Sequence, residues 1–215
     1  MNIALTKAEE SKAHEIDRVV NLITDLVYDY FNKGVKHESR IVNVKKSKKN
    51  SELDEWGYYV SHEIGLLAMI LRKNKVRSFM DLGCGAGVLL RILTMYTDGL
   101  IVGGIDNEPT LVKYCNERMA YGAKEADLLT ITRANVSRYE VLYFYEPLAG
   151  KEAAQKFVEN LSKIVVKGQY IIYYPAGYIW DYLNKSTNIK QINKGKYQYR
   201  IPFKIFKVTE TLNNK

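Results

Sequence analysis

Apolar residues recur at helical spacing in the first part of the chain. From Ile16 onward they fall three or four positions apart, which places them on one face of a helix. Before this run, Thr6 and Glu9 form the pattern of a capping box, in which each side chain accepts a hydrogen bond from the other residue's free backbone N–H. The pattern therefore predicts a helix from about Lys7 to Asn32.

Short runs of β-branched and aromatic residues alternate with further helical patterns along the rest of the chain. The expected strands cover residues 78–81, 100–105, 128–132, 140–144 and 169–175, with helices expected at 64–71, from 88 onward, and at 109–122, 151–166 and 177–183. Strands that alternate with helices build a doubly wound α/β sheet of mostly parallel strands. Two further alternating runs, 197–201 and 203–208, predict a closing antiparallel pair.

The turn after the first expected strand is rich in glycine. The strand ends at Asp81, and glycine then occupies every second position at Gly83, Gly85 and Gly87. Glycine tolerates positive φ angles and lets a ligand approach the backbone where any Cβ would collide with it. A dinucleotide fingerprint would need a third small residue where this chain has Val88, and the carboxylate of Asp81 suits a ligand with an ammonium group better than one with phosphates. Nicotinamide cofactors therefore fit this turn poorly.

The run Asp-Leu-Gly-Cys-Gly-Ala-Gly from Asp81 to Gly87 resembles the first motif of the class I S-adenosylmethionine-dependent methyltransferases. The resemblance implies a Rossmann-like sheet of seven strands, with the last strand inserted antiparallel, and an activity that converts S-adenosylmethionine to S-adenosylhomocysteine. It also implies which residues hold the methionine part of this cofactor, namely Asp81, Gly83, Cys84, Gly85 and Gly87.

The other cofactor contacts follow from later positions in the same family pattern. Asp106 ends the second expected strand, at about the spacing from the glycine turn expected of an acid that binds ribose hydroxyls, and Asn107 follows it. Asn135, after the expected third strand, offers a carbonyl oxygen to the adenine amino group, although an ordinary turn-forming role is an equal alternative. By analogy of position, a segment before the first motif closes over the cofactor, and Tyr59 is its candidate contact.

The loop after the fourth expected strand faces the methyl donor in this family. Here it contains Tyr145, Glu146 and Pro147, and it lacks the Asp or Asn, Pro, Pro and aromatic run that is common in methyltransferases acting on base amino groups. The resemblance makes Glu146 and Tyr145 the candidate catalytic residues, with Glu146 orienting or deprotonating the acceptor and Tyr145 presenting its ring face to the sulfonium. A buried aromatic strand end followed by a solvent-facing glutamate is the structural alternative.

The formal net charge of +8 is unevenly distributed. Residues 33–49 have six lysines and Arg40 against Glu38, and residues 185–215 have seven lysines and Arg200 against Glu210, so the rest of the chain is mildly acidic. Such basic segments bind nucleic acid, acidic protein surfaces or anionic lipid, or they only solvate the surface. The two cysteines and three histidines have no metal-ligand spacing, and two cysteines give no disulfide framework, which favours a reducing cytoplasm.

The sequence predicts two parts, an N-terminal helical cap with a basic loop at 1–75 and a Rossmann-like methyltransferase core at 76–215. We find no signal peptide and no apolar run long enough to span a membrane.

Three functions remain open. A methyltransferase acting on a macromolecule such as RNA or protein is slightly favoured, and the alternatives are a small-molecule methyltransferase and a non-catalytic module that binds S-adenosylmethionine. The methyl acceptor and the oligomeric state are not defined by the sequence.

Overall fold

The computed structural model describes residues 1–31, 64–120, 122–145, 147–148, 150–174, 178–193 and 203–212. These residues form a seven-stranded sheet in the order β3-β2-β1-β4-β5-β7-β6. The strands from β1 to β5 run parallel, and β7 lies antiparallel between β5 and β6. The expected doubly wound sheet with an inserted antiparallel strand is therefore confirmed.

The parallel strands are short, and most are buried on both faces. Their bounds are Ser78–Leu82 for β1, Ile101–Asp106 for β2, Ala123–Glu125 for β3, Val141–Tyr145 for β4 and Tyr170–Tyr174 for β5. The two strands at the antiparallel end are Ile189–Gln191 for β6 and Lys204–Val208 for β7. Every residue of β1 is buried, as expected for a central strand of a parallel sheet covered by helices on both faces.

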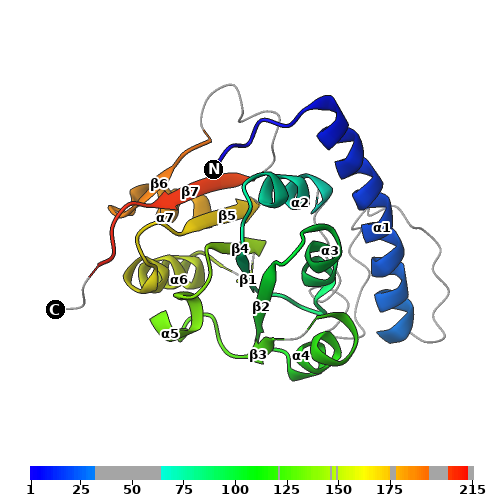
Figure 1. Ribbon diagram of the computed structural model, residues 1–215. Coiled ribbons are helices and arrows are strands. Elements are labelled where there is room, and N and C mark those ends of the chain that lie inside the picture. The colour runs from blue at the N-terminus through cyan, green and yellow to red at the C-terminus, as the bar shows by residue number, and fades with distance from the viewer. Residues whose placement is uncertain are drawn as a thin grey trace.

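Helices cover both faces of this sheet (Figure 1). One face carries α1 (Lys7–Phe31), α2 (Ile64–Lys73) and α3 (Val88–Tyr96), whose apolar residues share one buried cluster with Phe79, Tyr143 and Ile172 of the sheet. The other face carries α5 (Arg133–Val136), α6 (Lys151–Ile164) and α7 (Ile179–Lys185), which share a second cluster with Phe144 and Phe206. The helix α4 (Pro109–Tyr114) continues into a π-helical turn, η1 (Cys115–Met119).

The N-terminal helix begins with the capping box that the sequence predicts. The backbone N–H of Thr6 donates to Oε2 of Glu9 at 2.7 Å, and the N–H of Glu9 donates to Oγ1 of Thr6 at 3.3 Å. Further along, α1 crosses α2 so closely that a Cβ on Gly65 would overlap the carbonyl of Ala13, and the N–H of Gly65 donates to Oδ1 of Asp17 at 2.8 Å. The buried face of α1 is thus joined to the core through α2, and the domain boundary near residue 75 stays a prediction.

The third strand was wrongly predicted. The structure places β3 at Ala123–Glu125 rather than at 128–132, and the latter residues form a turn and the approach to α5. Leu128 and Ile131 are buried all the same, so their apolar character reflects packing under α6 and not strand pairing. At the other end of the sheet, the sequence prediction missed β6, and the expected strand at 197–201 and the basic loop at 34–51 lie outside the described residues.

Candidate functional site

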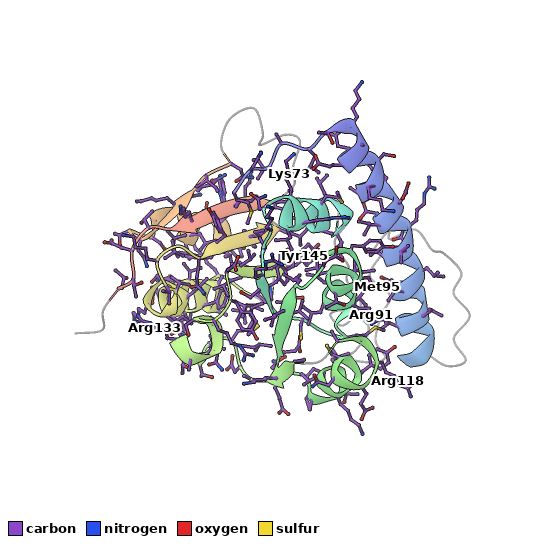
Figure 2. The ribbon with its side chains drawn as sticks, in the orientation of Figure 1. Lys73, Arg91, Met95, Arg118, Arg133 and Tyr145 are labelled. Carbon is purple, nitrogen blue, oxygen red and sulfur yellow. The ribbon has the colours of Figure 1, made fainter. Side chains whose placement is uncertain are left out.

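The carboxyl ends of the parallel strands bring the predicted site residues to one edge of the sheet. The strand order reverses direction between β1 and β4, and in open α/β sheets the crevice at such a switch point is where ligands bind. The glycine turn after β1, Asp106 at the end of β2 and Tyr145 at the end of β4 all lie along this edge. Tyr145 is near the centre of the molecule in Figure 2.

The backbone of the glycine turn has the conformation that its sequence predicts. Gly83, Gly85 and Gly87 have φ angles of 100°, 50° and 82°. The N–H groups of Gly83 and Cys84 both donate to the carbonyl of Ile105, at 2.7 and 3.0 Å, which fixes the turn against the end of β2. Gly87 is required for a second reason, since a Cβ there would overlap the sulfur of Cys115. These contacts therefore hold the turn in place, and α3 begins directly after it, with Gly87 as its N-cap residue.

Asp81 is a buried carboxylate at the beginning of this turn. Its side chain is 4% exposed, and no hydrogen bond or ion pair reaches the carboxylate within the described part of the chain. Burial raises the pKa of Asp81 well above its ordinary value, and the nearby charge of Asp106 raises this pKa further. A buried carboxylate with no partner destabilises the fold, so a cation bound at this edge would relieve that cost.

Asp106 is held in place by two backbone groups. The N–H of Gly85 donates to its Oδ2 at 2.8 Å, and the N–H of Glu108 donates to its Oδ1 at 3.0 Å. Each carboxylate oxygen can accept a further hydrogen bond, so the half-buried side chain can still receive the two hydroxyls of a ribose. Asn107, the next residue, is exposed at the same edge.

The side chain of Cys84 points into the protein rather than toward the edge. Its sulfur lies so close to Gly104 of β2 that a Cβ at that glycine would be 2.6 Å away. A hydrogen bond with Cys115, together with burial, raises the pKa of the Cys84 thiol well above its ordinary value. The side chain of Cys84 therefore faces the core, and its backbone N–H and carbonyl hydrogen-bond to Ile105 and Gly87, so the predicted contact of Cys84 with a ligand stays a prediction.

The loop after β4 lies against the glycine turn. A Cβ on Gly83 would come within 2.9 Å of Cβ of Pro147, so the two loops are in contact. The ring of Tyr145 lies 5.0 Å, between centroids, from that of Tyr174 at the end of β5, and Tyr174 lies 6.0 Å from Phe203, just before β7. This row of aromatic rings borders the turn on its β4 side. The other predicted catalytic residue, Glu146, lies outside the described residues, as does Tyr59.

Asn135 is engaged within its own loop. Its Oδ1 accepts hydrogen bonds from the N–H and the hydroxyl of Thr132, at 2.8 and 2.9 Å, as part of the capping box that begins α5. Both acceptor positions of that oxygen are thus used. The prediction of an adenine contact at Asn135 depended on a third strand at 128–132, and the structure places that strand earlier.

The corrected strand points to an acid that the sequence analysis missed. Asp127 is the second residue after β3, and the N–H of the residue between, Ala126, donates to the carbonyl of Asp106 at 3.0 Å. Asp127 is exposed, and its Oδ1 accepts from the N–H of Leu129 at 2.9 Å. The signal in the sequence was an acid a few residues after Gly122, which was hidden because β3 is short and polar. Along the edge, Asp81 is the next-to-last residue of β1, Asp106 is the last residue of β2, and Asp127 comes two residues after β3.

The described residues contain neither a metal-binding cluster nor a membrane-spanning helix. No group of three or more His, Cys, Asp or Glu side chains there is arranged to hold a metal ion. No helix among the same residues has the length and apolar character needed to cross a membrane.

Comparison with solved structures identifies the fold. A putative caffeoyl-CoA O-methyltransferase from Staphylococcus aureus superposes with a TM-score of 0.51 and 15% identity, over 74% of this chain and 88% of that one. The N-methyltransferase NodS from Bradyrhizobium japonicum WM9 superposes with a TM-score of 0.50 and 13% identity, over 67% of this chain and 93% of that one. Together with the strand order, these similarities show that the chain has the class I methyltransferase fold.

Other comparisons extend less far. Streptomyces venezuelae DesVI superposes with a TM-score of 0.44 and 15% identity. The match covers 53% of this chain and 50% of the DesVI chain, so this chain spans about half of the length of DesVI. No protein-family model matches the sequence, and no curated protein matches it.

Proposed function

We propose that this chain is an S-adenosylmethionine-dependent methyltransferase that binds its cofactor across the glycine turn and the three acids at the strand ends. The observation that carries the proposal is Asp81, a buried carboxylate that has no hydrogen-bond or ion-pair partner among the described residues and that lies beside a turn of three glycines with positive φ angles. The ammonium group of the methionine part would be the partner of Asp81. The solved structures of related fold include proteins described as methyltransferases, which supports the same cofactor here.

The remaining contacts divide the cofactor among the strand ends. Asp106 would accept hydrogen bonds from the ribose hydroxyls, since its oxygens are oriented by Gly85 and Glu108 and each retains acceptor capacity. Asp127 would accept a hydrogen bond from the adenine amino group, and we propose it in place of Asn135 because the oxygen of Asn135 is already shared with Thr132. Asn107 and Tyr59 stay as predicted contacts.

The cofactor supplies an activated methyl group, so the protein has mainly to position the acceptor and to exclude water. The ring of Tyr145, at the carboxyl end of β4 and packed against Tyr174, is suited to border a positively charged sulfonium through its π face. The acceptor approaches from the loop after β4, because Pro147 brings that loop against Gly83. Glu146 stays the candidate for orienting or deprotonating the acceptor.

Replacement of Asp106 tests this arrangement. We expect Asp106→Ala to weaken S-adenosylmethionine binding by more than about tenfold, because loss of a charged hydrogen-bonding group costs about 1.5–3 kcal/mol. The matched control is Asp98→Ala, which removes an exposed acid from the loop before β2, at the opposite edge of the sheet. Equal affinity of the Asp106→Ala variant and the wild-type protein, measured by isothermal titration, would remove the assignment.

The non-catalytic alternative has its own test. A purified chain that binds S-adenosylmethionine is incubated with radiolabelled cofactor and with RNA, protein and small-molecule fractions. Label transferred to any fraction supports the enzyme, whereas tight binding without transfer to any of them supports a cofactor-binding module.

A further inference from the structure

The end of the sheet formed by β6 and β7 carries exposed aromatic residues at the same edge as the cofactor turn. In β7, which runs antiparallel to β5, Lys204 is paired with Tyr173, so β7 begins where β5 ends. In β6, Gln191 is paired with Phe206 of β7 and is the last residue of its strand. The first turn of α7, which follows β5 in the chain, therefore lies beside the beginning of β7 and the end of β6.

Two large aromatic side chains are exposed in this first turn of α7. Tyr178 is 53% exposed and Trp180 is 39% exposed. The indole of Trp180 is held in place, since its Nε1 donates to Oε1 of Gln191 at 3.3 Å and the ammonium nitrogen of Lys204 lies 5.7 Å from the ring centroid. Aromatic side chains such as Tyr and Trp are enriched at surfaces that bind a partner, and this indole is both exposed and oriented.

This surface adjoins the aromatic row that borders the cofactor turn. Phe203 contacts Tyr174 in that row, and the next residue, Lys204, contacts Trp180. Consecutive residues of an extended chain point to opposite faces of a sheet. Phe203 belongs to the buried cluster under α2 and α3, whereas Lys204 lies on the face of Phe206 and Val208 under α7. The surface at α7 and the proposed acceptor entrance therefore meet at the beginning of β7.

The charge of this region favours an anionic partner. From 178 to 193 and from 203 to 208 the chain has four lysines and a single acid, Asp181. The lysines are divided between two faces, however, because Lys190 is paired with Lys207 on the face opposite to Lys204. The fourth lysine, Lys185, is at the other end of α7, where its ammonium nitrogen lies 5.8 Å from the ring centroid of Tyr182. Lys204 is therefore the lysine beside the exposed indole, and Lys190 provides a control of equal charge on the other face.

We propose that Tyr178, Trp180 and Lys204 form a docking surface for single-stranded nucleic acid, whose bases stack on the aromatic rings and whose phosphates pair with the lysine. This inference rests on the proposed function, because the strand would lead its target nucleotide to the methyl donor past Phe203. Base stacking on aromatic side chains combined with basic groups is the common means of binding single strands. An acidic protein would use the lysine without requiring an exposed indole and phenol.

Fluorescence anisotropy with a labelled RNA of about 12 nucleotides, which is within the usual site size, tests the docking surface. We expect binding that weakens between about 50 and 200 mM salt. Trp180→Ala should weaken binding by about tenfold and Trp180→Phe by much less, because the phenylalanine ring still stacks. Lys204→Ala should weaken binding several-fold and reduce the slope of log affinity against log salt by about 0.7, the contribution of one phosphate contact on a single strand.

Lys190→Ala is the matched control, and we expect it to leave both affinity and salt slope nearly unchanged. Equal losses in Lys190→Ala and Lys204→Ala, with Trp180→Ala neutral, would reduce the binding to general charge attraction and overturn the proposal. Preferential binding of a polyglutamate peptide, insensitive to Trp180→Ala, would instead assign the surface to an acidic protein. If the protein binds S-adenosylmethionine but not RNA, the docking surface is overturned and the proposed function is left intact. If the protein binds RNA but not S-adenosylmethionine, the proposed function is overturned and the docking surface is left intact.

Discussion

Replacing the buried carboxylate of Asp81 by an amide should raise the stability of the fold and, at the same time, weaken the binding of S-adenosylmethionine. Asp81→Asn keeps the shape of the side chain and removes its charge. Burial raises the pKa of Asp81 in the folded protein, so the folded state holds this proton more tightly than the unfolded state. Folding stability is therefore lost as the pH rises above the ordinary carboxyl value of 3.8 toward the raised value, and the variant should avoid that loss.

The expected size of each effect follows from the burial of the side chain. At 4% exposure and without a hydrogen bond from the described residues, ionised Asp81 has a desolvation cost, and we expect the neutral amide to reduce it by about 1 kcal/mol at pH values where the carboxyl group is ionised. For a chain of this length we expect the melting temperature to rise by about 2–4 °C. Loss of the charged partner of the cofactor ammonium should in turn weaken S-adenosylmethionine binding by about 1.5–3 kcal/mol, or about 10- to 150-fold.

Proton release provides a second measurement on the same residue. The cofactor ammonium favours ionised Asp81, so binding should expel a proton at pH values up to the raised pKa of the free protein, and affinity should increase with pH over that range. Isothermal titration in two buffers of different ionisation enthalpy measures this release, which Asp81→Asn should abolish. Asp98→Asn is the control, since Asp98 is exposed at the opposite edge. A variant that melts below the wild-type protein and binds S-adenosylmethionine equally well would refute the reasoning.

Three further substitutions test the site and its supports. Gly87→Ala should lower the melting temperature, because φ of Gly87 is 82° and the new Cβ would overlap the sulfur of Cys115. If that overlap contributes, the double variant with Cys115→Ala should melt at a higher temperature than Gly87→Ala alone. Asn193→Ala leaves a buried carbonyl of Phe203 without its 2.6 Å hydrogen bond and should cost about 2 kcal/mol, or about 4–8 °C in melting temperature, whereas an unchanged melting curve would contradict this. Asp127→Ala should abolish the preference for S-adenosylhomocysteine over its inosine analogue in competition binding, since the 6-oxo group repels a carboxylate; a preference that persists would move the adenine contact elsewhere.

Local signals were enough to predict most of the fold. The capping box at Thr6 and Glu9, the helical apolar spacing of α1 and the buried strand before the glycine turn are all properties of adjacent residues, and each is present as expected. The alternating pattern at 203–208 predicted an antiparallel strand, but its insertion within a seven-stranded sheet came from the resemblance alone. Pairing order depends on contacts between residues far apart in the chain, which periodicity does not show.

The errors lie where short elements depend on their neighbours. β3 has only three residues, of which two are exposed at the sheet edge, and such a strand leaves little hydrophobic pattern. The more apolar run at 128–132 resembles a strand in sequence because a buried turn and a buried strand have similar composition. This error also moved the adenine prediction to Asn135 and away from Asp127, and the missed strand β6 is equally short.

Isothermal titration of the purified chain with S-adenosylmethionine, with NADH as the matched negative ligand, tests the central claim most directly. The arrangement of Asp81, the glycine turn and Asp106 predicts binding of S-adenosylmethionine in the micromolar range and no binding of NADH. A folded protein that binds NADH, or that binds neither ligand, would contradict the account of this site.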